Sequence, residues 1–332
     1  MTTRAFYRAI AIPGAEPPYD RASLKVYYPA RYGDTAEERN TGVIPADSKH
    51  APFPVVILLP GINVGPESYG WLAKGLAERG AVTVTFTLVA EEMPGYISLT
   101  PGLAIPALLP ENYGKVPSAT AIGPILEELA VMNNAGVLAG CLDLDRIVLG
   151  GHSAGGTVAL LNARPDWFPG ICAAFSYGAH TAAAAAMGYP QDSFFGTPTE
   201  VPTLVMGGTR DGCIAGSAGR YGDSESSPTE RVERTFDEAM AGNRSPCALA
   251  VIDGANHFSM AYPADDSTGR PFIDMETTQA DDAIRELLLS LVGDFISGYA
   301  AGEAAMREQL QKTLQGRHPL IARGALRAGI DI

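Results

Sequence analysis

The chain has 332 residues, 46% of them hydrophobic, and its 24 basic and 37 acidic residues give a formal net charge of −13. This acidic balance argues against nucleic acid and anionic membrane surfaces as partners. No run approaches the roughly 18 apolar residues of a membrane span, and the N-terminus lacks the apolar core of a signal peptide. We therefore expect no membrane span and a cytoplasmic protein, unless a signal peptide has been removed, and a chain of this length can form one α/β domain.

Strand-like and helix-like patterns alternate along the chain. Two early strands, at about 4–12 and 22–29, alternate enough for an antiparallel hairpin at a sheet edge, and a polar connection follows. Six more strands are expected, with helices between most of them. Because such alternation produces parallel sheets, the pattern predicts an α/β fold with an eight-stranded, mostly parallel sheet and helices on both faces. The six strands lie at about 55–59, 82–88, 145–150, 171–176, 202–207 and 247–252.

The third expected strand is apolar throughout, as a strand covered on both faces would be. It is the run Pro54-Val-Val-Ile-Leu-Leu59, which breaks at Pro60-Gly61-Ile62-Asn63-Val64-Gly65 before a helical pattern begins at Glu67. This loop leaves the carboxyl end of a buried strand, which is the edge where open parallel sheets carry their sites.

A strand, a tight turn and a small-residue helix follow one another around Ser153. The apolar run that begins at Arg146 ends in Gly151-His-Ser-Ala-Gly155, and a helical segment follows from Thr157. This order is the context of a nucleophile elbow, where a serine hydroxyl stands clear of the backbone. A serine that merely caps the helix is the alternative interpretation.

A nucleophilic serine needs a base, and the chain has only five histidines. His50 and His318 lie in a polar loop and in the tail, and His152 is expected to point away from the neighbouring hydroxyl. His257 follows the strand Ala248-Leu-Ala-Val-Ile252 across a short turn, so we favour it as the base. His180, which follows another expected strand, is the rival.

The acid that orients the base is expected after the strand at 202–207. Asp211 leaves this strand through Gly207-Gly-Thr-Arg, which places it on the same edge as Ser153 and His257. The chain order serine, aspartate, histidine is the order of an α/β-hydrolase sheet. Asp253 is the fallback, although a turn residue is the simpler interpretation of its place before Gly254.

Acyl transfer also requires donors for the oxyanion of the tetrahedral intermediate. One donor is expected to be the backbone N–H of Ala154, directly after the nucleophile. We nominate the backbone N–H of Ile62 as the other, because it lies in the loop after an early buried strand. The Ile62 side chain is then free to line the substrate pocket.

Two insertions are expected to shape the substrate site. The segment 91–120 carries five prolines among apolar residues, which exclude a long helix, yet it is too apolar for a free linker. We expect it to wall an apolar pocket, with a surface loop packed on the core as the alternative. The segment 177–200, with His180, Phe194 and Phe195, is the expected second wall.

The remaining segments carry less chemistry. A helix over 280–300 has one apolar face and is expected to close the core, and the tail 301–332 is expected to serve dimerisation or to pack down. The acidic loop from Asp265 to Glu276 lacks calcium-loop spacing, and we expect it to be solvated. The four cysteines have no paired or zinc-ribbon spacing, so neither a metal nor a cofactor is expected.

Together these motifs resemble the α/β-hydrolase superfamily, and most of all its dienelactone-hydrolase-like branch. The branch includes chlorophyllase-like, platelet-activating-factor-acetylhydrolase-like and cutinase- or polyesterase-like serine esterases, and the organisation is similar over about 20–300. The resemblance implies ester hydrolysis by Ser153, Asp211 and His257, with oxyanion donors at Ile62 and Ala154. Isoleucine stands where polyesterases carry an aromatic residue after Pro-Gly, and serine replaces the nucleophilic cysteine of dienelactone hydrolase.

The sequence therefore predicts one α/β-hydrolase domain over 1–332 that acts as a serine carboxylesterase on uncharged, fairly apolar small-molecule esters. Ile62, His180 and Phe258 are the expected substrate contacts, and a homodimer is compatible with the tail. Two alternatives remain open, namely an amide or peptide hydrolase with the same triad and a non-catalytic ligand receptor with the same fold.

Overall fold

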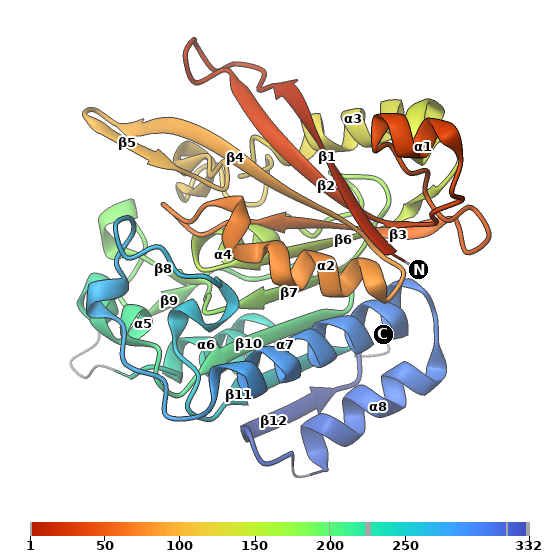
Figure 1. Ribbon diagram of the computed structural model, residues 1–332. Coiled ribbons are helices and arrows are strands. Elements are labelled where there is room, and N and C mark those ends of the chain that lie inside the picture. Colours follow the sequence, from red (N-terminus) through yellow and green to blue (C-terminus); the bar gives the residue numbers. More distant parts are fainter. Residues whose placement is uncertain (1, 199, 223–226, 317, 330–332) are drawn as a thin grey trace.

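The computed structural model describes residues 2–198, 200–222, 227–316 and 318–329 (Figure 1). Nine strands of a ten-stranded sheet follow one another in the order β1-β2-β4-β3-β6-β7-β10-β11-β12, from the top to the bottom of Figure 1, and the tenth, β5 (Tyr96–Leu99), pairs with β4. Their bounds are β1 Thr2–Ala11, β2 Arg21–Ala30, β3 Phe53–Leu59, β4 Val82–Met93, β6 Leu142–His152, β7 Ile171–Tyr177, β10 Thr203–Gly208, β11 Cys247–Ile252 and β12 Ile321–Arg327.

The middle of this sheet is parallel and its ends are antiparallel. Strands β4, β3, β6, β7, β10 and β11 run in one direction, whereas β1 pairs antiparallel with β2, β2 with β4 and β12 with β11. The prediction of an α/β fold with a mostly parallel sheet is thus confirmed. All eight expected strands occur, but the expected total of eight is wrong, because the C-terminal tail adds β12 at the edge and the segment after β4 adds β5.

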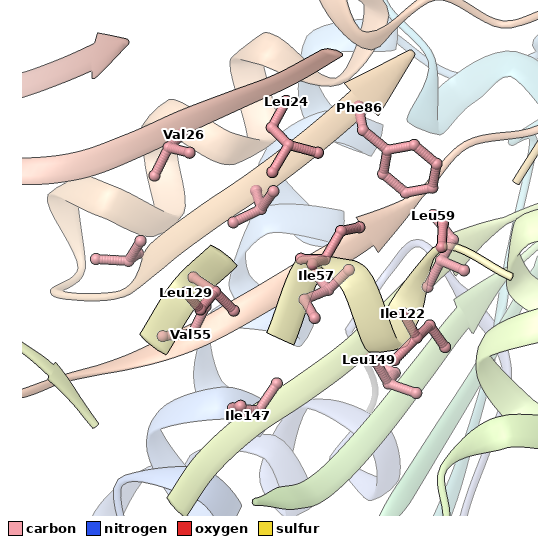
Figure 2. Close-up of a cluster of buried hydrophobic side chains, with 14 of the residues drawn as sticks. Leu24, Val26, Val55, Ile57, Leu59, Phe86, Ile122, Leu129, Ile147 and Leu149 are labelled. Carbon is pink, nitrogen blue, oxygen red and sulfur yellow. The ribbon is translucent and has the colours of Figure 1, made fainter. Parts of the chain in front are cut away.

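Helices cover both faces of the sheet because the central strands are apolar on both sides. Along β3, Val55, Ile57 and Leu59 belong to one buried cluster, and Val56 and Leu58 belong to another. The first cluster contains side chains of α3 (Ile122–Asn134) and α4 (Ala154–Asn162), and Figure 2 shows α3 packed over strands β2, β3, β4 and β6. The second contains side chains of α2 (Gly70–Glu78) and α7 (Asp281–Phe295).

The C-terminal extension packs on the body of the protein. Helix α8 (Ala304–Gln315) and β12 follow α7, and Leu310, Leu314 and Leu320 join the buried cluster of α2 and α7. Of the two roles expected for the tail, packing is therefore observed. Among the described residues, no helix is long and apolar enough to cross a membrane.

The parallel strands end along one edge, and short elements gather there. His152 at the end of β6 pairs with Tyr177 at the end of β7, and Gly208 of β10 pairs with Ile252 of β11. On the left of Figure 1, this edge is surrounded by β5 (Tyr96–Leu99), β8 (Ala182–Ala183), β9 (Ser193–Phe194) and α5 (Gly212–Gly216). Strand β5 pairs only with β4, and β8 pairs with β9 in a separate two-stranded sheet.

Candidate active site

Ser153 occupies a strained turn between β6 and α4. Its backbone has φ 54° and ψ −127°, a conformation that L-residues rarely adopt and that costs about 1–3 kcal/mol. The Ser153 N–H donates to the carbonyl oxygen of Tyr177 at 2.9 Å, which ties the turn to the end of β7. Both Ser153 and Ala154 remain partly exposed. The turn therefore presents a serine at the carboxyl edge of the sheet.

The flanking glycines are required by close contacts between backbones. A Cβ on Gly151 would lie 2.2 Å from the carbonyl oxygen of Gly155, and one on Gly155 would lie 2.3 Å from the carbonyl oxygen of Leu59. No side chain fits in either place, because such distances lie far inside van der Waals contact. The same contact brings the end of β3 beside the first turn of α4.

Asp211 and His257 form a buried hydrogen-bonded pair at the same edge. His257 Nδ1 lies 2.8 Å from Asp211 Oδ2, and the other carboxylate oxygen of Asp211 accepts the N–H of Ile214 at 2.8 Å. Asp211 is fully buried and His257 is 5% exposed. Since a carboxylate only accepts, His257 Nδ1 carries the proton, which leaves Nε2 as the basic nitrogen of the neutral ring.

The environment of His257 favours its protonated form. Burial alone would lower the pKa of the imidazole, but the charge of Asp211 and the hydrogen bond that His257 donates to it outweigh this effect. The negative charge of Asp274 acts in the same direction, and Arg270 acts against it. The net result is a pKa of His257 above its usual value of 6.5. An imidazolium formed by proton transfer at this position is thus stabilised.

His152 is held by both ring nitrogens and is not available as a base. Its Nε2 donates to the carbonyl oxygen of His257 at 2.9 Å, and its Nδ1 accepts from the hydroxyl of Tyr69 at 2.9 Å. The Tyr69 hydroxyl in turn accepts the N–H of Gly61 at 2.9 Å. Burial, and then the neighbouring His257, lower the pKa of His152 well below 6.5. This neutral ring links the Gly61 loop to the His257 loop.

His180, the rival base, is also held as a neutral ring. Its Nδ1 accepts the N–H of Ala182 at 3.2 Å, and its carbonyl oxygen accepts from the hydroxyl of Thr157 in the first turn of α4. Burial, together with the charge of Arg231, lowers the pKa of His180 to about 3. Since the His180 ring is a weak base and Asp211 pairs with His257, His257 is the better candidate for the base. His180 nevertheless lies beside α4, near Ser153.

Asp253, the fallback acid, has other partners. Its Oδ2 accepts from the side-chain amide of Gln279 at 2.8 Å, and its Oδ1 lies 3.5 Å from the hydroxyl of Thr209. These contacts hold the turn before Gly254 and do not involve His257. The carboxylate that faces the imidazole is that of Asp211.

The loop that carries Ile62 runs against Ser153 and is anchored from two directions. A Cβ on Gly61 would lie 3.2 Å from the Cβ of Ser153. Asn63 adopts a left-handed φ of 58°. Its N–H donates to the carbonyl oxygen of Leu99 in β5, and its Oδ1 accepts the N–H of Leu99, each at 3.0 Å. The Asn63 carbonyl oxygen accepts from the hydroxyl of Thr268 at 2.9 Å. Ile62 itself is half-buried.

The two insertions meet and form one apolar cluster. The ring of Phe195 lies between those of Tyr113 and Tyr189, at centroid distances of 4.7 and 4.9 Å. Phe195 is buried with Leu108, Ala183 and Leu161, and Leu161 belongs to α4. The segment 91–120 also extends β4 into a hairpin with β5. The segments expected to form the two walls of the site thus pack against each other.

Two further residues follow the members of the pair along the chain: Cys213 comes two residues after Asp211, and Phe258 directly follows His257. The half-buried ring of Phe258 has its centroid 5.5 Å from that of His257. Cys213 is buried, and burial together with the charges of Asp274 and Asp211 raises the pKa of its thiol to about 12. This cysteine is therefore an uncharged thiol at neutral pH and a poor nucleophile.

The acidic loop is not solvated throughout, contrary to expectation, because Asp274 is partly buried and contacts two other loops. Its Oδ1 accepts the N–H of Gly212 at 2.8 Å, and its Oδ2 accepts the N–H of Phe258 at 3.1 Å. The neighbouring Asp265 and Asp266 are exposed, and Glu276, also exposed, contacts the Asp211 loop through its carbonyl oxygen, which accepts from Arg210 Nε at 3.2 Å. No sequence signal distinguishes Asp274 from its acidic neighbours, because its partners are backbone groups distant along the chain.

The fold and the site define an α/β protein with a mostly parallel sheet and polar side chains at its carboxyl edge. No protein-family model matches the chain, and no curated protein is significantly similar to it in sequence. Within the described ranges, no three or more His, Cys, Asp or Glu side chains are grouped so that they could hold a metal ion.

Proposed function

We propose that this protein is a serine carboxylic-ester hydrolase of the α/β-hydrolase type. The observation that carries the proposal is the buried Asp211–His257 pair, which stands at the same sheet edge as the strained turn of Ser153. Their order along the chain, with the strand-turn-helix context of the serine, is the order of an α/β-hydrolase. In this proposal the whole chain is one catalytic unit, because its site residues come from loops between 61 and 274.

In the proposed mechanism, the Ser153 hydroxyl attacks the ester carbonyl as its proton passes to Nε2 of His257. Asp211 holds the ring in the required tautomer and stabilises the imidazolium. The backbone N–H groups of Ile62 and Ala154 donate to the oxyanion, each contributing about 3 kcal/mol to transition-state stabilisation. The imidazolium then protonates the leaving alcohol, and a water molecule activated by His257 releases the acid from Ser153.

The surroundings of the site support an uncharged, fairly apolar substrate. Half-buried Ile62 stands on the loop that runs against Ser153, and half-buried Phe258 directly follows His257. The buried cluster around Phe195 includes Leu161 of α4, the helix that begins after Ser153. Apolar side chains of this kind suit an acyl chain or an apolar alcohol group, since the site gains by removing them from water. His180, beside the first turn of α4, is the proposed third contact.

The experiment that tests this proposal is hydrolysis of p-nitrophenyl esters from acetate to palmitate. We expect turnover by the wild type and a loss of at least about 1,000-fold in kcat for Ser153→Ala, as removal of a triad nucleophile produces. The exposed Ser267 provides the matched control, and Ser267→Ala is expected to retain full activity. The preferred chain length would measure the depth of the pocket.

Three results would contradict the proposal. Equal turnover by the wild type and Ser153→Ala would exclude this serine as the nucleophile. Preferential cleavage of p-nitroanilides would assign the triad to amide hydrolysis. Stoichiometric binding of esters by folded protein without turnover would indicate a ligand receptor.

A further inference from the structure

One segment after His257 contacts the loops that carry Ile62, Asp211 and His257. The segment 261–280 connects His257 to α7, and Thr268 within it donates to the carbonyl oxygen of Asn63 in the Ile62 loop. The N–H of Tyr262 donates to Ser68 at 2.7 Å, just before α2. Asp274, near the end of the segment, contacts the loops of both Asp211 and His257. This segment thus bridges elements that are far apart in the sequence.

Asp274 accepts hydrogen bonds from three backbone N–H groups, namely that of its neighbour Met275 at 3.0 Å and two that have a specific place in the site. Gly212 directly follows Asp211, and Phe258 directly follows His257, so one carboxylate bonds the residue after each member of the pair. The contact is close, because a Cβ on Gly212 would lie 2.3 Å from the carbonyl oxygen of Ile273 and 2.7 Å from the Cα of Asp274. On the other side of His257, the side-chain amide of Asn256 donates to the carbonyl oxygen of Met275 at 2.8 Å.

The carboxylate of Asp274 also acts through its charge. Burial and the neighbouring Asp211 raise its pKa above the usual 3.8, whereas His257 and the two N–H donors oppose the rise. Around the imidazole of His257, Asp211 and Asp274 are the negative groups and Arg270 is the positive one, and His152 and His180 are neutral. A second negative charge near the ring strengthens the stabilisation of the imidazolium.

We propose that Asp274 is a positioning residue that fixes the Asp211 and His257 loops to one another and adds a second negative charge beside the imidazole. The inference rests on the proposed function, since it assigns to Asp274 a role in the same reaction. The carboxylate acts through Asp211 and His257 and need not touch the substrate. Its two oxygens suit this task because Oδ1 accepts a backbone N–H of the Asp211 loop and Oδ2 accepts one of the His257 loop.

The test compares Asp274→Asn with Asp266→Asn, a charge removal at an exposed position of the same loop. We expect Asp274→Asn to lower kcat for ester hydrolysis about 10- to 100-fold with little change in KM, because misalignment affects the transition state most. The acidic limb of the kcat/KM profile is expected to move to lower pH by up to about one unit, since the imidazolium loses a favourable charge. Asp266→Asn is expected to change neither.

Asp274→Glu separates charge from position. It keeps the negative charge, so the acidic limb is expected to stay near that of the wild type while kcat falls. Urea unfolding of each variant checks that the protein is folded. If Asp274→Asn does not fold, the Glu variant still carries the test, because wild-type kcat in a variant with a displaced carboxylate would overturn the positioning role.

An NMR titration of the His257 imidazole keeps this proposal distinct from the proposed function. It measures the pKa of the ring without turnover, and we expect a lower pKa of His257 in Asp274→Asn than in the wild type. If the wild type hydrolyses no ester while this shift is observed, the ester-hydrolase assignment fails and the link between Asp274 and His257 stands. An unchanged pKa together with unchanged kcat in Asp274→Asn would overturn the inference.

Discussion

At the scale of single residues, the Asp211–His257 pair leaves no room for a side chain at position 178, which is a glycine. Gly178 follows β7 with φ +58°, and a Cβ there would lie 2.9 Å from His257 Nδ1 and 3.1 Å from Asp211 Oδ2. Its N–H donates to the carbonyl oxygen of Met206 at 3.0 Å, so its backbone cannot easily move aside. The absence of a side chain at 178 thus permits the short hydrogen bond of the pair.

Gly178→Ala is therefore expected to lower kcat about 100-fold, since a displacement of the pair by a fraction of an ångström to 1 Å misaligns the base. The left-handed φ adds a loss of about 1 kcal/mol in the free energy of unfolding. Ester kinetics and urea unfolding measure the two effects separately. Gly242→Ala is the control, because Gly242 has an ordinary φ and no atom within 4 Å of its added Cβ. Wild-type kcat in Gly178→Ala would contradict this account.

The residues of the candidate site differ in how far the sequence could predict them. Asp211 and His257 each follow a recognisable strand, and parallel strands bring such loops to one edge, so loop placement sufficed to nominate both. Asp274 and Gly178 follow no such rule. The role of Asp274 depends on two backbone N–H groups, and that of Gly178 on a space of one methyl group. Neither property can be inferred from the local sequence, because both depend on residues distant along the chain.

At the scale of elements, the two insertions stabilise each other through aromatic contacts. Their proline and apolar content predicted packed segments, but composition could not show that Tyr113 of one and Tyr189 of the other enclose Phe195. The hydroxyl of Tyr189 also donates to the carbonyl oxygen of Leu108 at 2.9 Å. These contacts join segments that are about 80 residues apart, and they rest on Leu161 of α4.

Phe195→Ala is expected to lower the free energy of unfolding by about 3 kcal/mol, as truncation of a buried phenylalanine does. Because the cluster rests on α4, we also expect weaker discrimination between short and long p-nitrophenyl esters. Phe272→Ala is the matched control, since the ring of Phe272 is 81% exposed. Equal stability and equal chain-length preference in the two variants would show that the insertions fold independently of the site.

The last strand shows where prediction from local pattern ends. The segment Ile321-Ala-Arg-Gly-Ala-Leu-Arg327 has a glycine in its centre and incomplete alternation, so its strand character is weak. It becomes β12 because β11 offers an unpaired edge and Arg323 bonds Asp237 beside that edge. Gly324 is needed there, since a Cβ on it would lie 2.0 Å from the carbonyl oxygen of Leu314. The eight strands expected from the sequence, by contrast, show their pattern locally.

At the scale of the whole molecule, the extension determines which strand forms the edge of the sheet. Strand β12 covers β11, whose loop carries His257, and the N–H of Asp253 donates to the carbonyl oxygen of Leu320 at 2.8 Å. An exposed strand edge invites pairing with another chain. If the chain is one catalytic unit, as proposed, the extension and the catalytic loops should depend on one another.

A chain that ends at Gly302 lacks α8 and β12 and tests this dependence. We expect it to lose several kcal/mol of stability, because Leu310, Leu314 and Leu320 are buried and each contributes about 2 kcal/mol. It is also expected to self-associate through the uncovered edge of β11, and its ester hydrolysis should fall as the His257 loop loosens. A chain that ends at Ala328 keeps both elements and serves as the control. Urea unfolding and light scattering measure stability and mass, and a shortened chain with the mass, stability and activity of this control would make the extension a separate appendage.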